Sequence, residues 1–408
     1  MTTPDAVKTA SEWRAGGKML FAATVCYCCM SMPLTGLGVM IKPLSELYGW
    51  SRAAITSVVL ITALGTMLIA PLVGHIVDRI GPRRVGLVGL WLLGAGIAGI
   101  GFAGPSITSW YIAWTVYAVL QPAAGNVVWA SAITGRFDRH RGLALAVLLS
   151  GLSVVASLLP MIALATMNLF GWRPVFFLLG GFTVTVAWPL AWLWFYGTHD
   201  LRPDKSVRAD PLPGHTLAEA LRTRQFWQIA AIGMLVAAAV AALYVHLQPI
   251  LSDAGLSRET AALVAVVIGP AAMAGRFASG FMLDRLPAPL VATLVLMLPG
   301  ISHALIYFNP SSVPLALVCA ITLGAAHGAE SDLLAFLASR YFGLRAFSVI
   351  YGLLLGVFSV GYGIGPLLAG KSFDQFGTYA PVFAAMMGAA ALGAVLSATL
   401  GRYPRFTT

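Results

Sequence analysis

Apolar segments of about twenty residues recur twelve times along the 408-residue chain. A helix of that length, at a rise of ~1.5 Å per residue, covers the hydrocarbon core of a bilayer, which is about 30 Å thick. Inside a bilayer every backbone polar group has to be paired within the protein, so each such segment is expected to be helical. We therefore predict an all-α membrane protein with twelve transmembrane helices. The predicted spans are 19–41, 53–73, 83–103, 107–134, 142–165, 174–197, 226–250, 260–282, 288–308, 313–338, 346–369 and 380–400.

The composition agrees with this class of protein. Only 10% of the residues are charged and 59% are hydrophobic, whereas a soluble chain of this length needs far more charge on its surface. The four cysteines lack the paired spacing and the histidine partners of a zinc site, so we expect neither a metal nor a cofactor. They are Cys26, Cys28, Cys29 and Cys319. The first apolar segment is long enough to span, so we expect a retained anchor and no cleaved signal peptide.

One long polar connection divides the spans into six and six. It covers residues 198–224 and carries several charged residues among prolines. We therefore expect an N-terminal six-helix bundle (1–197), a cytoplasmic linker (198–224) and a C-terminal six-helix bundle (225–408). Near the end of the linker, the spacing of Thr216 and Glu219 fits a capping box, which predicts a short helix from about that point.

The basic residues predict the orientation in the membrane. With the N-terminus inside, the cytoplasmic segments hold 19 of the 25 lysines and arginines, the opposite side holds five, and the last is Arg276 within a span. By the positive-inside rule both termini are expected in the cytoplasm of a multi-pass protein of the cell membrane, of the bacterial inner-membrane type. The positive charge is dispersed over loop ends and forms no single basic face, so we expect no nucleic-acid partner.

The two halves of the sequence repeat each other. Four landmarks recur in the same order at offsets of 204 to 207 residues, which indicates two pseudo-symmetric bundles. They are Ser51-Arg52 with Ser257-Arg258, Asp78-Arg79 with Asp284-Arg285, Arg136 and Arg141 with Arg340 and Arg345, and Pro174 with Pro381.

The loop after the second span resembles the signature loop of the major facilitator superfamily. It reads Gly74-His-Ile-Val-Asp78-Arg79-Ile-Gly-Pro-Arg83-Arg84, and a degenerate copy runs from Gly280 to Arg285. The resemblance implies a transporter of two six-helix bundles with a conformational latch on the cytoplasmic side. The matching latch residues are Gly74, Asp78, Arg79, Arg83, Asp284 and Arg285. A plain positive-inside loop is the alternative; it explains the arginines but not Asp78.

Arg276 stands out in this sequence for the free energy needed to place it in a membrane. It lies within an apolar span, where an arginine costs on the order of 3 kcal/mol. In the repeat its counterpart is Ala70, so the charge is not part of the shared scaffold. A guanidinium is a planar fork that matches a carboxylate and stays charged, which predicts an anion-binding residue. The alternative is a permanent ion pair with Glu330 or Asp332 that only holds helices together.

Further motifs resemble the monocarboxylate transporter and oxalate:formate antiporter branch of that superfamily. They are Gly49-Trp-Ser-Arg52, His246-Leu-Gln-Pro249, Gly275-Arg276, Gly328-Ala-Glu-Ser-Asp332 and Arg340-Tyr-Phe-Gly343. In that branch the arginine of the eighth span binds the substrate carboxylate, and Arg276 matches it. The chain departs from these relatives because its eighth span holds no acid before Asp284, and residues 33–38 and 348–370 hold no lysine. With one central positive charge, we expect the substrate to be a monoanion.

Proton coupling needs a group that titrates, because Arg276 does not. The candidates are Glu330, Asp332, His246 and His327, and Glu330 is the first choice among them. His327 lies three residues before Glu330 and therefore on the same helical face. Asp332 is about 200° away from Glu330 around the helix and is expected to point elsewhere, toward a helix contact. A buried histidine such as His246 can equally be a helix–helix contact.

Several polar and aromatic side chains of other spans are expected to line the cavity, where they would suit an aromatic or branched acid. They are Tyr27, Tyr117, Gln121, Asn126, Trp129, Tyr244 and Gln248. Together with Arg276, the residues Tyr117, Asn126, Tyr27, Gln248 and His327 form the predicted substrate-binding set. Each of them, taken singly, could instead serve packing or anchor the chain at the interface.

We therefore predict a secondary active transporter, a monomer whose partners are a small organic carboxylate, a proton and the lipid bilayer. Its two bundles would rock about a central site, and proton symport would drive import. An organic anion exchanger or a drug or metabolite efflux carrier is the alternative. An enzyme is not expected, because the sequence has no HExxH or GxSxG motif. The match of residues 365–372 to a phosphate loop ends a span and lacks the strand that such a loop follows, so we attribute it to chance.

Overall fold

The computed structural model describes residues 4–137, 141–196, 214–283, 285–343, 345–401 and 403–404; within these ranges, the side chains of 4–12, 78, 134–135, 141–142 and 348 are not described. Among the described residues, twelve helices are long and apolar enough to cross a membrane. The number and order of the predicted spans are confirmed. The charged stretch 198–213 of the predicted linker lies outside the described residues.

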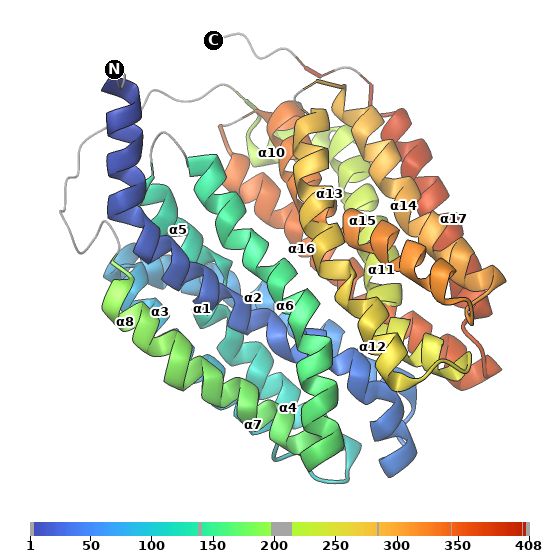
Figure 1. Ribbon diagram of the computed structural model, residues 1–408. Coiled ribbons are helices and arrows are strands. Elements are labelled where there is room, and N and C mark those ends of the chain that lie inside the picture. Colours follow the sequence, from blue (N-terminus) through green and yellow to red (C-terminus); the bar gives the residue numbers. More distant parts are fainter. Residues whose placement is uncertain are drawn as a thin grey trace. The chain divides into compact units, whose positions relative to one another are not determined.

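The chain forms two compact units, and each is described here by itself. The first contains Met1–Gly36 and Leu64–Lys205, and the second contains Leu37–Ala63 and Ser206–Thr408. Helices α1 (Pro4–Tyr48) and α2 (Arg52–Ile80) therefore contribute to both units (Figure 1). The end of α1 and the start of α2 cluster with the C-terminal helices, a division that differs from a cut at the linker.

The remaining elements of the first unit follow α2 in chain order. They are α3 (Pro82–Ile100), α4 (Ile107–Leu120), the 3₁₀ turn η1 (Gln121–Ala124), α5 (Asn126–Arg136), α6 (Arg141–Phe170), α7 (Trp172–Phe182), the π-helical turn η2 (Thr183–Ala187) and α8 (Trp188–Trp194). Aromatic rings make edge-to-face contacts between α4 and α7, with 5.9 Å between the centroids of Trp110 and Trp172. Such pairs favour a fixed geometry in a buried core.

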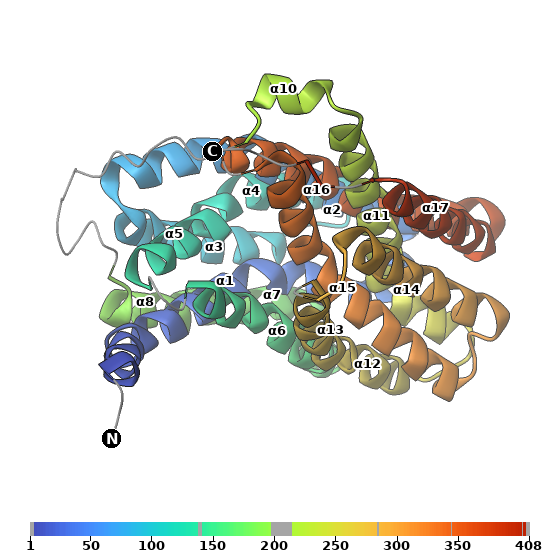
Figure 2. The same ribbon diagram turned by 90° about the horizontal axis from the view of Figure 1, so that it is seen from above.

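Eight further helices lie among the described residues of the second unit. They are α10 (Leu217–Arg222), α11 (Arg224–Asp253), α12 (Arg258–Val266), α13 (Ile268–Leu283), α14 (Ala288–Phe308), α15 (Val313–Phe342), α16 (Phe347–Phe376) and α17 (Ala380–Ala398). Within this unit α13 lies beside α15, α11 beside α16, and α14 beside α17 (Figure 2). The helix α11 is buried along most of its length, which is expected of a central helix whose sequence is apolar on all sides.

Three of the predicted spans are not continuous α-helices. The fourth contains η1, where Pro122 has no N–H for a helical hydrogen bond. The eighth is divided into α12 and α13 at Val267, and the sixth contains the π-helical turn η2. Interruptions of these kinds are frequent at functional positions of transporter helices.

The capping box predicted at the end of the linker is present. The side-chain oxygen of Thr216 accepts a hydrogen bond from the Glu219 N–H at 3.3 Å, and the Thr216 N–H donates to Glu219 Oε2 at 2.8 Å. The short helix α10 follows. A backbone contact, from the His215 N–H to the Phe342 carbonyl at 2.8 Å, joins this segment to the end of α15.

Candidate functional site

The contact between α13 and α15 positions the candidate site, and glycine makes the contact close. A Cβ at Gly275 would collide with the backbone of Ala325, and a Cβ at Gly328 would collide with the backbone of Ala272. Small residues allow two helices to approach until their backbones touch, as is common in membranes. The side chain of Arg276, next to Gly275, therefore meets the backbone of α15 directly.

Arg276 is paired with Asp332. Its Nε donates a hydrogen bond to the Gly328 carbonyl at 3.3 Å and lies 3.1 Å from Asp332 Oδ2. Gly328 and Asp332 are four residues apart, so both face α13. Only 13% of the arginine side chain is exposed, against 32% of the aspartate. The buried Nη1 of Arg276 has no hydrogen-bond partner among the described residues and remains available as a donor.

The second acid of α15 has a different partner. Oε1 of Glu330 lies 2.8 Å from Nδ1 of His327, three residues earlier on the same face, as the spacing predicts. Glu330 is almost fully buried, and its other oxygen, Oε2, has no partner in the described part of the chain. A buried polar atom without a partner is rare and calls for an explanation, such as a bound proton or an absent ligand.

Aromatic rings surround His327. Its ring centroid lies 5.1 Å from that of Tyr244 on α11 and 6.2 Å from that of Tyr362 on α16. Tyr362 in turn stacks on Phe358, one turn earlier. Tyr362 is not among the predicted substrate-binding residues. It lies between Gly361 and Gly365, and small residues at that spacing are typical of close helix packing. The sequence signal that could have identified Tyr362 as a site residue is its position four residues before Pro366.

Two other predicted site residues of the second unit, His246 and Gln248, have other neighbours. Both ring nitrogens of His246 are engaged, Nδ1 with the Tyr379 hydroxyl at 3.1 Å and Nε2 with the Pro366 carbonyl at 3.0 Å. Gln248 lines a small recess with Lys42 and Ser252. None of the contacts described for either residue involves Arg276, so their predicted roles in coupling and binding are left to experiment.

The candidates of the first unit are placed as follows. Tyr117 is buried, and its hydroxyl donates to the Met30 carbonyl at 2.6 Å. Tyr27 is buried on α1. Asn126 is exposed at the start of α5, directly after η1. The hydroxyl of Tyr117 is thus engaged with the backbone of α1, whereas the predicted binding roles of all three stay predictions.

The predicted latch is described in part. Arg83 donates to the carbonyls of Phe195 at 2.7 Å and Trp192 at 2.8 Å, and its guanidinium lies 3.7 Å from the Tyr196 ring centroid. A cation at the carbonyl end of a helix is favourable because those carbonyls lack helical partners.

The other latch residues of the loops make fewer described contacts. Arg285 lies over the Phe281 ring at 3.5 Å, Arg79 is exposed, and Gly74 lies near Val127. The side chain of Asp78 and the whole of Asp284 lie outside the described residues. The latch function stays a prediction.

Comparison with known proteins agrees with the predicted family and fold. Residues 23–353 match the Major Facilitator Superfamily. Among curated proteins, the chain is 28% identical to monocarboxylate transporter 11 of Mus musculus over 372 residues, which cover 86% of this chain and 79% of that protein. It is 25% identical to monocarboxylate transporter 13 of Bos taurus over 319 residues, covering 77% and 72%.

The fold is also similar to that of solved structures. A bacterial homolog of the human lysosomal transporter Spinster, in an inward-facing and occupied conformation, superimposes with a TM-score of 0.71. The alignment covers 95% of this chain and 96% of that one at 17% sequence identity. At this identity the similarity concerns the fold alone.

Proposed function

The chain belongs to the major facilitator superfamily and is a transport protein, and from the surroundings of Arg276 we propose that it carries an organic monocarboxylate together with a proton. The relatives named monocarboxylate transporters support the substrate class. The observation on which the proposal chiefly rests is the ion pair of Arg276 with Asp332, at 3.1 Å.

The pair suggests how substrate and proton are linked. Arg276 stays charged under all relevant conditions, so it requires one negative partner in a membrane interior. In the structure that partner is Asp332. When Asp332 takes up a proton, the guanidinium is released for a substrate carboxylate. One proton and one monoanion then enter together, and the net charge of the site stays the same.

The geometry favours this exchange of partners over a permanent ion pair. Asp332 approaches Nε of the guanidinium, while the buried Nη1 has no partner among the described residues. A guanidinium binds a carboxylate best through two parallel N–H groups. A substrate that engages both would bind more favourably than Asp332 does. The aspartate side chain, 32% exposed, is accessible enough to exchange protons with water.

Glu330 and His327 form a second site that can hold a proton. The two side chains share one hydrogen bond, and the free oxygen Oε2 of Glu330 is buried. An unpaired buried oxygen costs free energy, and a proton bound there removes part of that cost. We place the exchange with substrate on Asp332, because it contacts Arg276 directly. His327, Tyr244 and Tyr362 then offer flat surfaces for the organic part of the substrate.

The orientation belongs to the same proposal. The excess of basic residues on one side supports cytoplasmic termini in the cell membrane, by the positive-inside rule. The N-terminal end of α1 then faces the cytoplasm, and its end at Tyr48 faces the outside.

Uptake into proteoliposomes tests the function. Purified protein would be given a panel of labelled monocarboxylates under an inward proton gradient, with and without a potassium diffusion potential. We expect accumulation that follows the pH gradient and is insensitive to the potential, since the cotransport of one proton with one monoanion moves no net charge.

Arg224→Lys is a suitable control, because Arg224 is an exposed arginine at the start of α11. Exchange of internal for external carboxylate without any response to pH would identify an anion exchanger instead. Absence of uptake across the whole panel would contradict the monocarboxylate proposal.

A further inference from the structure

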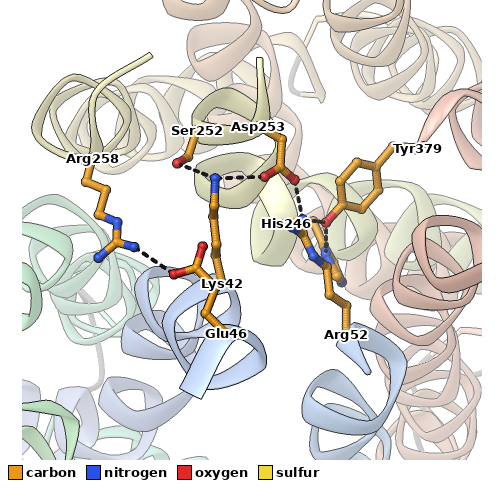
Figure 3. A network of polar contacts seen from close by, with 8 residues as sticks. All are labelled: Lys42, Glu46, Arg52, His246, Ser252, Asp253, Arg258 and Tyr379. Atoms are coloured by element: carbon orange, nitrogen blue, oxygen red, sulfur yellow. Dashed lines mark hydrogen bonds and ion pairs between the residues drawn. The ribbon is translucent and has the colours of Figure 1, made fainter. Parts of the chain in front are cut away.

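A polar cluster joins the end of α1 and the start of α2 to the C-terminal helices (Figure 3). It is centred on Asp253, Arg52 and Tyr379. The figure labels eight of its residues, and Asp374 of α16 also belongs to it. All of its residues belong to the second compact unit. The transport steps proposed for Arg276 do not involve this cluster.

Asp253, the last residue of α11, forms ion pairs with a lysine of α1 and an arginine of α2. Lys42 Nζ lies 3.0 Å from Asp253 Oδ1, and the guanidinium of Arg52 pairs with Oδ2. Lys42 also donates to the Ser252 hydroxyl at 3.3 Å. A further pair lies beside them, because Arg258 Nη2 is 3.1 Å from Glu46 Oε2.

Arg52 is the most enclosed of the arginine, lysine and acidic side chains in the cluster. It is 6% exposed, and its guanidinium lies 3.6 Å from the Phe373 ring centroid. It donates to the Tyr379 hydroxyl at 2.7 Å, which in turn contacts His246. Both ring nitrogens of His246 are thus engaged, one with the Tyr379 hydroxyl and one with the Pro366 carbonyl.

The start of α2 is capped by an acid from a distant helix. The N–H groups of Arg52 and Ala53 donate to the two oxygens of Asp374 on α16, each at 2.8 Å. The first N–H groups of a helix lack helical partners and are normally capped by a residue next to them. The repeat-related helix α12 follows that rule, because Ser257 accepts from the Thr260 N–H.

The sequence repeat relates two arginines of the cluster. At an offset of 206 residues Arg52 corresponds to Arg258, whereas Asp253 corresponds to Leu47. Both repeat-related arginines, Arg52 and Arg258, form ion pairs within the cluster. The acids that contact Arg52 come from the C-terminal half, and the acid that pairs with Arg258 comes from the N-terminal half.

We propose that this cluster is a lock, which holds the outer ends of α1 and α2 against α11, α16 and α17 and opens during each transport cycle. The proposal rests on the transport function and on the orientation given above. Ionic and hydrogen-bonded contacts suit a reversible contact because water can replace each partner on separation. Exposed ion pairs contribute little individually, and Glu46 and Arg258 are 54% and 44% exposed. Closure therefore depends on the sum of several weak contacts.

Labelling of a reporter cysteine tests the lock without knowledge of the substrate. Thr56→Cys places a thiol one turn after Arg52, at a fully buried position where the threonine hydroxyl donates to the Pro366 carbonyl at 3.2 Å. In membrane vesicles, the rate of its reaction with a membrane-impermeant maleimide measures how often the outer end opens. The unsubstituted chain, whose four cysteines are buried, gives the background.

Arg52→Gln or Asp374→Asn, added to Thr56→Cys, should each raise the labelling rate, by roughly tenfold for the loss of several contacts in a two-state equilibrium. Lys371→Gln is the matched control, since Lys371 is on α16 and none of the contacts described for the cluster involves it. Unchanged labelling in both folded variants would show that the cluster does not hold the outer end closed and would overturn the proposal.

The exposed pair gives a second test that does not depend on how well Arg52 variants fold. Arg258→Glu should raise the labelling rate, and the double exchange Glu46→Arg with Arg258→Glu should lower it again toward the starting value. If the double exchange labels as fast as the single variant, the pair does not hold the end closed. Because labelling needs no substrate, failure of the lock is distinguishable from failure of the monocarboxylate proposal.

Discussion

Arg276 and Asp332 lie 3.1 Å apart, from Nε to Oδ2, across the interface between α13 and α15. The acid thus comes from a different helix than its cation, and both positions depend on the glycine contacts that bring the two backbones together. Because Asp332 and Arg276 lie on different helices, a substrate can take the place of Asp332 as the partner of Arg276. An acid fixed on the same helix as Arg276 would be harder to displace.

Replacement of the guanidinium should abolish most transport while leaving the fold intact. Arg276→Lys keeps the charge but loses the planar pair of donors, so we expect the initial uptake rate to fall at least tenfold, corresponding to about 1.4 kcal/mol of lost binding in the rate-limiting state. Size-exclusion chromatography and thermal stability would serve as the folding control. Uptake within twofold of the unsubstituted protein would assign Arg276 to a structural ion pair.

The two acids of α15 should have separable effects. Asp332→Asn cannot release Arg276 by protonation, so we expect accumulation driven by the pH gradient to be lost while exchange of labelled for unlabelled substrate continues. Glu330→Gln keeps a side chain that can hydrogen-bond to His327, and it should retain pH-driven accumulation. Counterflow and gradient-driven uptake, measured on the same preparations, distinguish the two activities. The reverse pattern would assign proton coupling to Glu330.

The close contact of α13 with α15 predicts a stability effect. Gly328→Ala places a methyl group against the backbone of Ala272, where little space exists. Overpacking of this kind costs about 1–3 kcal/mol, so the melting temperature and the uptake rate should both fall. Gly352→Ala on α16 is the control, because a Cβ there meets nothing within 4 Å. Equal melting temperatures for the two variants would show that α13 and α15 can separate at no cost.

The capping box before α10 predicts a pH dependence outside the membrane. Hydrogen bonds from the Thr216 backbone and side chain lower the pKa of Glu219 below its ordinary value of 4.5. A carboxyl whose pKa is lowered by folding stabilises the folded helix above its unfolded pKa, and that contribution is lost as the pH falls through the folded value. Amide exchange of residues 217–222, corrected for the intrinsic pH dependence, should therefore show weaker protection near pH 3 than at pH 6. Glu219→Gln should reduce this difference, and an undiminished difference would exclude Glu219 as its source.

Local sequence patterns predicted the local features of the fold. Span length and apolarity located the twelve helices, and the spacing of Thr216 and Glu219 identified the capping box. The spacing of three residues also placed His327 and Glu330 on one helical face, where a hydrogen bond joins them. Each of these depends on neighbours within one or two helical turns.

Contacts between helices could not be predicted in the same way. The helical angle between Glu330 and Asp332 correctly indicated that they face different partners. Which of them meets Arg276, however, depends on the rotation of α13 against α15, and that rotation is fixed by the glycine contacts. The cap of α2 by Asp374 joins residues 322 positions apart, a distance over which no local periodicity acts.

The distant cap of α2 has a consequence for how the protein is made. Synthesis proceeds from the N-terminus, so α2 enters the membrane long before residue 374 has been translated. Until then its first N–H groups have only Ser51, which accepts from the Ala54 N–H at 3.1 Å, and water as partners. The N-terminal segment can therefore insert as helices on its own, but the start of α2 reaches its final hydrogen bonding only after α16 is in place. Completion of this part of the molecule is a late event in biosynthesis, even though its residues are among the first to be made.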